Sequence, residues 1–256
     1  MKNTSSTTSA LINFRDLGGL ECADGRRIKP GKIFRSPVLP LKNRADRNFL
    51  LGKNLQAILD LRTTEEVNEK NDWIPRGCEY IHAPAYTEQD YPHLPVSRAA
   101  RMRTFLLRNS HPDDVVEEKK ASYRTMPLQK EAFGRVFSLM DQGKTFLFHC
   151  SAGKDRTGIC AMFIEFSLGR TFESILSEYL KSDEIKKVYR RNNLKLLGAD
   201  DHLIDNINYC EGVHAELLEI SLQSMLTGYA SPMDFLAGEY GVTPDRAAKW
   251  KETYLE

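Results

Sequence analysis

The sequence has little cysteine, no long apolar run and no excess of charge of one sign. Its five cysteines are odd in number and form no Cys-x-x-Cys pair, so neither a disulfide framework nor a zinc site is indicated. The longest unbroken apolar run, "ICAMFI", is far shorter than the roughly 20 residues that span a bilayer. Lysine and arginine number 36 against 35 acidic residues. We therefore expect no nucleic-acid partner and no integral membrane association.

The N-terminal segment "MKNTSSTTSALINF" lacks the apolar stretch of a secretory signal, so we expect a cytoplasmic protein. Secretion without a cleaved signal stays open. The Ser/Thr-rich residues 1–10 are expected to fray. The sequence shows no internal repeat, and a hydrophobic content of 41% with 28% charged residues is ordinary for a globular protein. Residues 1–256 are therefore interpreted as a single domain.

Short apolar runs bounded by turn residues predict strands at "KIFRS", "LQAILDL", "YIHAPA" and "TFLFHC". Helical stretches separate these runs, which favours an α/β fold with a central, mainly parallel sheet flanked by helices. The segment "DLGGLECADGRRIKPG" contains many turn residues and predicts a small hairpin.

Capping residues predict where several helices begin. Thr63 and Glu66 have the spacing of a capping box directly after the strand "AILDL". The pairs Ser231-Pro232 and Thr243-Pro244 place proline at a first helical position, and Ser182 precedes two acidic residues. The last third of the chain is therefore predicted to be mostly helical.

Residues 86–130 differ from the rest of the chain because they carry four prolines and a basic stretch, "SRAARMRTFLLR". We interpret them as a long, partly helical insertion that serves as a lid or binding loop. Within the basic stretch, Arg98, Arg101 and Arg108 would share one side of a helix. They are either an extension of a binding site or a solvated face.

The strongest chemical signal is "HCSAGKDRTG", which runs from His149 to Gly158 between a predicted strand and an apolar helix. A loop that enters a helix N-terminus directs several backbone N–H groups at one point, where the helix dipole favours an anion. Gly153 allows the loop to curl closely. The sequence therefore predicts a site for a tetrahedral oxyanion.

Cys150 and Arg156 give this anion site a chemistry. The thiol of Cys150 lies in the field of a helix N-terminus and of neighbouring cations, which lowers a cysteine pKa and produces a nucleophilic thiolate. The planar guanidinium of Arg156 can bind two phosphate oxygens at once, which a lysine cannot do. The remaining four cysteines are expected to be small buried apolar residues: Cys22, Cys78, Cys160 and Cys210.

The Cys-x5-Arg pattern is that of the cysteine-dependent phosphatases, in which the thiolate attacks phosphorus and a phosphocysteine forms and is hydrolysed. Thr157 is placed to donate a hydrogen bond to the sulfur. Asp155 is the nearest carboxyl group that could protonate the leaving oxygen. No metal and no other cofactor is required. His149 is expected to orient the loop, with a plain core histidine as the alternative.

The loop resembles that of the bacterial tyrosine-phosphatase family, whose members act on phosphotyrosine and often on phosphoinositides. Further blocks are similar in the same order: "NFRDLGG", "IFRSP", "LDLRTTEE" and, near the end, "GVTPD". The resemblance covers most of the chain except residues 86–130. It implies a tyrosine-phosphatase-like fold with Cys150 as nucleophile, Arg156 as phosphate clamp and Asp155 as general acid.

The resemblance also implies that Asp60 lies at the substrate pocket, as ligands do beyond the carboxyl ends of parallel strands. A structural ion pair between Asp60 and Arg62 is the alternative. Substrate binding is further assigned to the loop residues Ser151, Ala152, Gly153, Lys154 and Thr157. Lys154 resembles a loop lysine of phosphoinositide phosphatases, and it would favour a substrate with a second phosphate. Glu66 is assigned to helix capping.

Several alternatives stay open. Many eukaryotic relatives carry the general acid on a separate loop, and "DWIP" at 72–75 or Asp113 and Asp114 could supply it here. A phosphate-binding module without catalysis is a second function class. A sulfurtransferase of the rhodanese kind is a third, although its loops lack the continuation "AGKDRTG".

Overall fold

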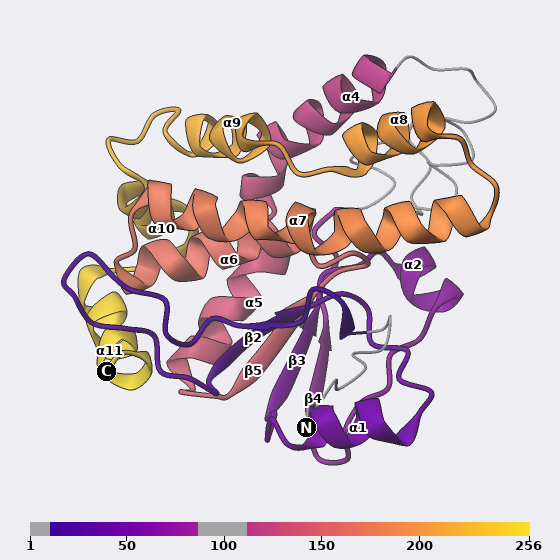
Figure 1. The fold of residues 1–256 in the computed structure, drawn as a ribbon. Coiled ribbons are helices and arrows are strands. Elements are labelled where there is room, and N and C mark those ends of the chain that lie inside the picture. The colour runs from indigo at the N-terminus through magenta and orange to yellow at the C-terminus, as the bar shows by residue number, and fades with distance from the viewer. Residues whose placement is uncertain (1–10, 87–111) are drawn as a thin grey trace.

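A computed structural model describes residues 11–86 and 112–256, and the predicted fraying of residues 1–10 lies outside this range. Its centre is a sheet in the order β1-β2-β5-β3-β4 (Figure 1). The strands are β1 (Arg15–Asp16), β2 (Ile33–Ser36), β3 (Ala57–Asp60), β4 (Glu79–His82) and β5 (Phe146–His149). Only β1 is antiparallel to its neighbour among the described strands. The four predicted strands and the mainly parallel sheet are confirmed.

The three central strands are buried on both faces. Successive residues alternate between two apolar cores, as strand geometry requires. Phe34, Ile58 and Leu147 point into the smaller core, which also holds Leu50 of α1 (Arg44–Leu51). Phe146 and Phe148 point into the larger one, beneath the long helices.

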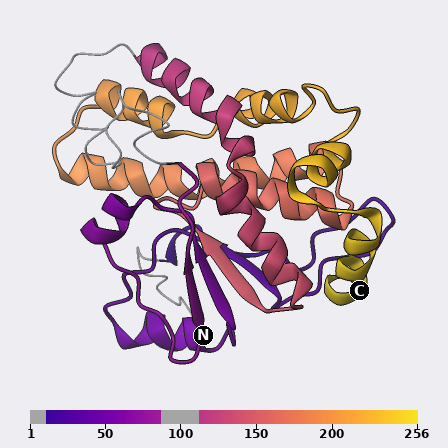
Figure 2. The ribbon, with the colours of Figure 1, turned by 180° about the vertical axis from the view of Figure 1, so that it is seen from behind.

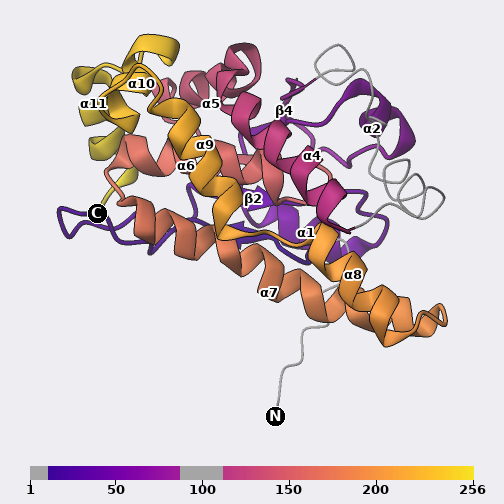
Figure 3. The same ribbon diagram turned by 90° about the horizontal axis from the view of Figure 1, so that it is seen from above.

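Helices cover both faces of the sheet (Figures 1 and 2). Besides α1, the described elements are α2 (Thr64–Glu69), α4 (Pro112–Thr125), the 3-10 helix η2 (Met126–Leu128), α5 (Lys130–Asp141), α6 (Asp155–Leu168), α7 (Phe172–Leu196), α8 (Asp201–Glu211), α9 (Ala215–Met225), α10 (Pro232–Tyr240) and α11 (Pro244–Tyr254). Seen from above, α7 runs along one side, and α4 and α9 lie side by side (Figure 3). The last third of the chain is helical, as predicted. Within the described ranges, no helix combines the length and the apolar character needed to cross a membrane.

Most of the predicted helix starts are confirmed. Thr63 and Glu66 form the reciprocal capping box of α2, and Ser231 and Thr243 cap α10 and α11. The start predicted at Ser182 is wrong, because this residue lies inside α7, which begins after the cap Thr171. The buried hydroxyl of Ser182 instead accepts a hydrogen bond from Arg15 Nη2 at 3.0 Å.

The two irregular regions partly match their predictions. The predicted hairpin contains an antiparallel bridge between Glu21 and Arg27, closed at Gly25, whose φ is 86°. The described end of the predicted insertion is helical, since it forms α4 and η2 before α5 begins. Helix α4 packs against α8 and α9. The basic stretch with Arg98, Arg101 and Arg108 lies outside the described residues.

Candidate active site

The loop between β5 and α6 is shaped by a close approach to β2. Gly153 has a φ of 67°, and a Cβ placed on it would lie 2.5 Å from the carbonyl oxygen of Ser36. Only glycine fits both conditions. The first turn of α6 receives no side-chain cap from Lys154, the residue at its N-cap position. Its N–H groups therefore provide the positive helix end that was predicted to hold an anion.

Cys150 lies at the start of this loop and is 2% exposed. The hydroxyl of Thr157 donates a hydrogen bond to its sulfur over 3.1 Å. Burial opposes ionisation of the thiol, but the charge of Arg156 and the hydrogen bonds from the Thr157 side chain and backbone outweigh it. The net result is a lowered pKa of Cys150, as a nucleophilic cysteine requires.

Arg156 is buried and bound to the carboxylate of Glu66. Its Nη1 lies 2.5 Å from Glu66 Oε2 and its Nη2 lies 3.0 Å from Oε1, so both terminal nitrogens meet the carboxylate. The guanidinium carbon is also 4.7 Å from the ring centre of Tyr86. Although burial disfavours the cation, these neighbours keep the pKa of Arg156 raised. The arginine is therefore a fixed positive charge six residues beyond Cys150.

Glu66 is the residue whose importance the sequence reasoning missed. It completes the capping box of α2, as assigned, but it also accepts a hydrogen bond from Ser151 Oγ at 2.7 Å and holds Arg156. Burial would raise the pKa of Glu66, and the charge of Arg156 with these hydrogen bonds lowers it to about 2. In the sequence, the capping box was a sufficient reason for a glutamate at this position, so no second role was expected. Its place beside the loop follows only from the pairing of β3 with β5.

Two residues near the N-terminus support the loop from behind. Asn13 Nδ2 donates to the carbonyl oxygens of Gly153 at 2.8 Å and Ala152 at 3.3 Å. Arg35 on β2 donates to the same Gly153 oxygen at 3.1 Å. Because Asn13 and Arg35 bind the carbonyl oxygens of the loop, its N–H groups can point away from these two residues. This explains structurally why the blocks "NFRDLGG" and "IFRSP" accompany the loop.

Asp155 begins α6 and faces α4. Its Oδ1 accepts a hydrogen bond from the Tyr123 hydroxyl at 2.7 Å and lies 3.3 Å from Lys119 Nζ. Burial would raise its pKa, but the charges of Lys119 and Lys154 with the Tyr123 hydrogen bond lower it strongly. This carboxyl group is therefore ionised in the structure as it stands.

The other candidate acids occupy different positions. Asp72 of "DWIP" is not on an open loop, because its carboxylate is bound by Arg62 and by the N–H of Leu39. Asp113 and Asp114 are exposed in the first turn of α4. Of these carboxylates, only Asp155 directly follows the loop that holds Cys150, as the first residue of α6.

Lys154 does not extend into an open pocket in this structure. Its side chain is buried, and its Nζ donates to the carbonyl oxygen of Glu211 at the end of α8. Burial lowers the pKa of Lys154 to about 8. The loop is thereby attached to α8.

Asp60 forms a buried cluster with Arg62 at the end of β3. Arg62 Nε lies 2.9 Å and 3.0 Å from the two carboxylate oxygens, and the Tyr80 hydroxyl donates to Oδ2 at 2.7 Å. His149 Nδ1 lies 3.8 Å from Asp60 Oδ1. Burial would raise the pKa of Asp60, and the charges of His149 and Arg62 lower it. The alternative of a structural ion pair is what the geometry favours, because Asp60 is completely buried and saturated by these partners.

The same cluster has the residue types of a metal site. Ligand atoms of Asp60, Asp72 and His149 lie within 4.8 Å of one another. The guanidinium of Arg62, however, contacts both carboxylates and supplies the positive charge that a cation would bring. The donors therefore fit an ion-pair cluster better than a metal centre.

The remaining cysteines lack the surroundings that lower the pKa of Cys150. Cys22, Cys160 and Cys210 are buried, as expected, whereas Cys78 is only half-buried. Burial raises the pKa of each of these four thiols. Cys150 alone among the described cysteines has a lowered pKa.

Comparison with known sequences agrees with this geometry. A protein of Cupriavidus necator, provisionally named a tyrosine-protein phosphatase, is 29% identical over 231 residues, which are 88% of this chain and 80% of that protein. The triple specificity protein phosphatase PtpB of Mycobacterium tuberculosis is 28% identical over 67% of each chain. A tyrosine-protein phosphatase of Nostoc commune is 30% identical over 46% of this chain and 36% of its own. The sequence model of a family described as the tyrosine phosphatase family matches residues 7–256. With its loop geometry and this match over nearly its full length, the chain belongs to the tyrosine phosphatase family.

Proposed function

We propose that the protein hydrolyses phosphomonoesters of tyrosine in proteins or peptides through a phosphocysteine intermediate. The observation that carries this proposal is the buried Cys150 thiol, which accepts a hydrogen bond from the Thr157 hydroxyl and whose pKa is lowered by the charge of Arg156 and by that hydrogen bond, against the effect of burial. An alternative as a non-catalytic phosphate-binding module would need neither this thiol nor its activation.

In the first step, the Cys150 thiolate attacks phosphorus in line with the ester bond. The sulfur–phosphorus bond forms, the phosphorus–oxygen bond breaks, and its electron pair stays on the tyrosine oxygen. The N–H groups of residues 151–156 and the Arg156 guanidinium hold the equatorial oxygens. Glu66 fixes the plane of that guanidinium, so the clamp is in position before the substrate arrives.

Asp155 gives the leaving oxygen its proton. The carboxylate is ionised beside Lys119, and it must gain a proton before it can donate one. A phosphate dianion entering the loop adds negative charge next to it, which favours the protonated form. Asp155 then returns to a carboxylate as tyrosine leaves.

In the second step, water attacks the phosphocysteine while Asp155 takes up its proton. The sulfur–phosphorus bond breaks, and the electron pair returns to Cys150. The Thr157 hydroxyl donates to the sulfur over 3.1 Å, which stabilises the departing thiolate. Inorganic phosphate is released without any cofactor.

Phosphoinositide hydrolysis is a second part of the proposal. The Mycobacterium tuberculosis relative is named for triple specificity, which supports a substrate range beyond phosphotyrosine. Lys154 would bind a second phosphate only after its amine leaves the Glu211 carbonyl. Substitution of Lys154 by alanine should then lower kcat/KM for a phosphoinositide severalfold more than for a phosphotyrosine peptide.

The direct test is hydrolysis of p-nitrophenyl phosphate and a phosphotyrosine peptide by the wild type and by Cys150→Ser. We expect turnover of both substrates, and a loss of at least about 10³-fold in the folded variant, because a serine hydroxyl is not ionised at neutral pH. The variant should still bind vanadate. Retention of more than a few per cent of the activity would remove Cys150 as nucleophile, and turnover of thiosulfate instead would favour a sulfurtransferase.

A further inference from the structure

Two residues of α4 hold one oxygen of the Asp155 carboxylate. The Tyr123 hydroxyl donates to Oδ1 at 2.7 Å, and Lys119 Nζ lies 3.3 Å from the same oxygen. Lys119 and Tyr123 are one turn apart and therefore share a face of α4. The Asp155 side chain is nonetheless 28% exposed. Because both contacts reach Oδ1, Oδ2 is the oxygen that can meet a substrate.

Tyr123 is itself held in place by a second phenol. Its hydroxyl lies 2.8 Å from that of Tyr179 on α7, and both residues are buried. A phenol has one proton to donate, so with the Tyr123 proton on Asp155 the Tyr179 hydroxyl is the donor within the pair. Burial and the charge of Asp155 raise the pKa of both phenols well above its ordinary value. Both tyrosines are therefore neutral donors in a chain that ends at Asp155.

The first turns of α6 are shaped to receive Tyr179. A Cβ placed on Gly158 would lie 2.8 Å from Cδ2 of the Tyr179 ring and 2.9 Å from its Cε2. Only a residue without a side chain leaves room for this ring. Asp155 begins the same helix. The packing of Tyr179 therefore sets where Asp155 lies relative to the tyrosine chain.

Two lysine amines near Asp155 are attached to the end of α8. Lys119 Nζ donates to the carbonyl oxygen of Gly212 at 2.5 Å, and Lys154 Nζ donates to that of Glu211. The last carbonyls of a helix carry partial negative charge and suit such cations. The end of α8 thus fixes the position of both amines.

Groups on the loop and on α4 act on the charge of Asp155. Burial would raise its pKa, and the charges of Lys119 and Lys154 are the largest influences that lower it, together with the Tyr123 hydrogen bond. The Cys150 thiolate acts in the opposite sense, because two negative charges repel. Lys119 is therefore the main partner of the carboxylate outside its own segment.

We propose that Tyr123 and Lys119 are positioning residues of the reaction, which hold Oδ1 of Asp155 so that Oδ2 exchanges the proton. The inference rests on the proposed phosphatase function. Oδ2–H protonates the ester oxygen in the first step, and Oδ2 takes a proton from water in the second. Tyr123 sets the direction of the group, since a phenol can bind the carboxylate and the carboxylic acid through the same oxygen. Lys119 favours the carboxylate, the form that the second step needs.

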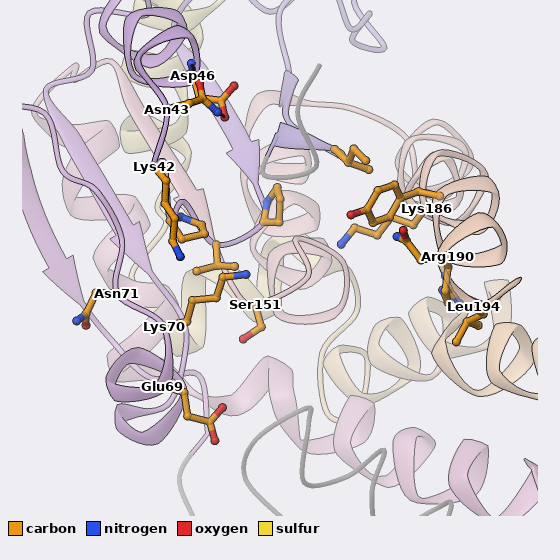
Figure 4. Close-up of a pocket in the computed structure, with 16 residues that line it drawn as sticks. Lys42, Asn43, Asp46, Glu69, Lys70, Asn71, Ser151, Lys186, Arg190 and Leu194 are labelled. Carbon is orange, nitrogen blue, oxygen red and sulfur yellow. Dashed lines mark hydrogen bonds between the residues drawn. The ribbon is translucent and has the colours of Figure 1, made fainter. Parts of the chain in front are cut away.

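The two positioning residues lie apart from the cavity beside the loop. This cavity, of about 790 Å³, adjoins the loop at Ser151 and extends between the segment after β2 and helix α7 (Figure 4). We expect the rest of a peptide substrate there, because ligand sites are concave. None of the described residues that line it belongs to α4. Substitutions of Tyr123 and Lys119 should therefore leave the Kd of a phosphotyrosine peptide for the Cys150→Ser protein unchanged.

Tyr123→Phe tests the hydroxyl and keeps the ring. It should lower kcat/KM for a phosphotyrosine peptide roughly 10-fold. For p-nitrophenyl phosphate, whose leaving group needs no proton, the loss should be less than about twofold. Tyr254→Phe, which removes an equally buried hydroxyl from the Lys144 carbonyl, should not change the ratio of the two.

The same hydroxyl is then removed where its acceptor has already been changed. In the Asp155→Asn background, Tyr123→Phe should have no further effect on the ratio. Equal losses on the two substrates, or a further change in that background, would overturn the role of Tyr123. So would a weakened Kd of the peptide, because Tyr123 would then contribute to substrate binding.

Lys119→Met tests the charge. Its loss should raise the pKa of Asp155, so the alkaline limb of the kcat/KM profile for the peptide should shift to higher pH. Lys119→Arg keeps the charge and should keep the profile of the wild type. Lys120→Met, whose amine pairs with Glu117 and Glu216, is the control on the same helix. An unmoved limb in Lys119→Met, or the same shift in Lys120→Met, would overturn the role of Lys119.

Failure of the inference can be told apart from failure of the proposed function. A wild type that hydrolyses neither substrate would contradict the proposed function, and the inference with it. An active wild type whose Asp155→Asn variant slows both substrates equally would leave the phosphatase function standing. It would overturn the inference alone, because Asp155 would then transfer no proton.

Discussion

Arg62 and Arg156 are both buried at the same edge of the sheet, yet their surroundings differ. Arg62 is 1% exposed and contacts Asp60, Asp72 and two backbone carbonyls through all three of its nitrogens. Arg156 is 3% exposed and donates hydrogen bonds to one carboxylate, that of Glu66, and to one backbone carbonyl, that of Leu61. All three nitrogens of the first arginine are bound by the protein, whereas the second arginine lies in the first turn of α6, next to the loop that carries the Cys150 thiol.

The difference shows that burial of a charged residue does not reveal its role. What separates the two arginines is the backbone that carries them. Arg62 lies where β3 leads to a capped helix, while Arg156 lies in α6, whose first turn has no side-chain cap. An uncapped helix end near a paired arginine leaves donors for an anion, and a capped end does not.

The largest effect should come from removing each arginine in turn. Arg156→Met and Arg62→Met each leave a buried carboxylate without its partner, which costs about 3–5 kcal/mol of stability. Only Arg156→Met should also reduce kcat/KM, by roughly 10³-fold, because it removes the phosphate clamp. The measurement is turnover per folded molecule at a temperature where both variants are folded. Equal losses in the two variants would mean that Arg156 is as structural as Arg62.

A second, smaller effect is expected when Asp155 and Asp60 are compared: only the loss of Asp155 should change how kcat/KM depends on the leaving group. Asp155→Asn should slow phosphotyrosine, which has a poor leaving group, roughly 10²-fold more than substrates whose leaving groups need no proton. Asp60→Asn should lower stability without changing this ratio, because its carboxylate contacts Arg62 and Tyr80 instead of the loop. The check is kcat/KM across aryl phosphates of increasing phenol pKa. A steeper dependence for variants of Asp113 or Asp114 would place the acid on α4.

The smallest effect concerns the thiol itself. The lowered pKa of Cys150 keeps a thiolate present at pH values where an ordinary cysteine is protonated, so alkylation by iodoacetamide should stay fast as the pH falls through that range. Thr157→Val removes one hydrogen bond to the sulfur. The pH at half-maximal alkylation should therefore rise, and the rate of alkylation below the pKa of an ordinary cysteine should fall. An unchanged profile would show that Thr157 does not act on the thiolate.

The fold and the place of the Cys150 loop between a strand and a helix were predictable because each depends on local pattern. Buried strands read as short apolar runs, and the glycine, cysteine and arginine of the loop stand in one continuous segment. Ser182 was misread because a serine before acidic residues has the same pattern inside a long helix as at its start. Only the capping role of Glu66 was predicted, because it is local. Its contact with Arg156 depends on which strands pair.

Lys154 shows a further limit of local reasoning. Its position in the loop indicated a cation directed at the substrate, but a long side chain can turn to a distant carbonyl. Here that carbonyl belongs to Glu211 at the end of α8. Such a contact between residues far apart in the chain leaves no signal in the sequence around either of them.

The most direct test of the central claim is to trap the phosphoenzyme. The wild type is mixed with an aryl phosphate, quenched in acid within milliseconds, digested and examined by mass spectrometry. The proposed mechanism predicts a phosphate adduct on the peptide that contains Cys150, and none on that peptide from Cys150→Ser or on peptides with Cys160. Steady turnover with no adduct on Cys150, or an adduct on another residue, would contradict it.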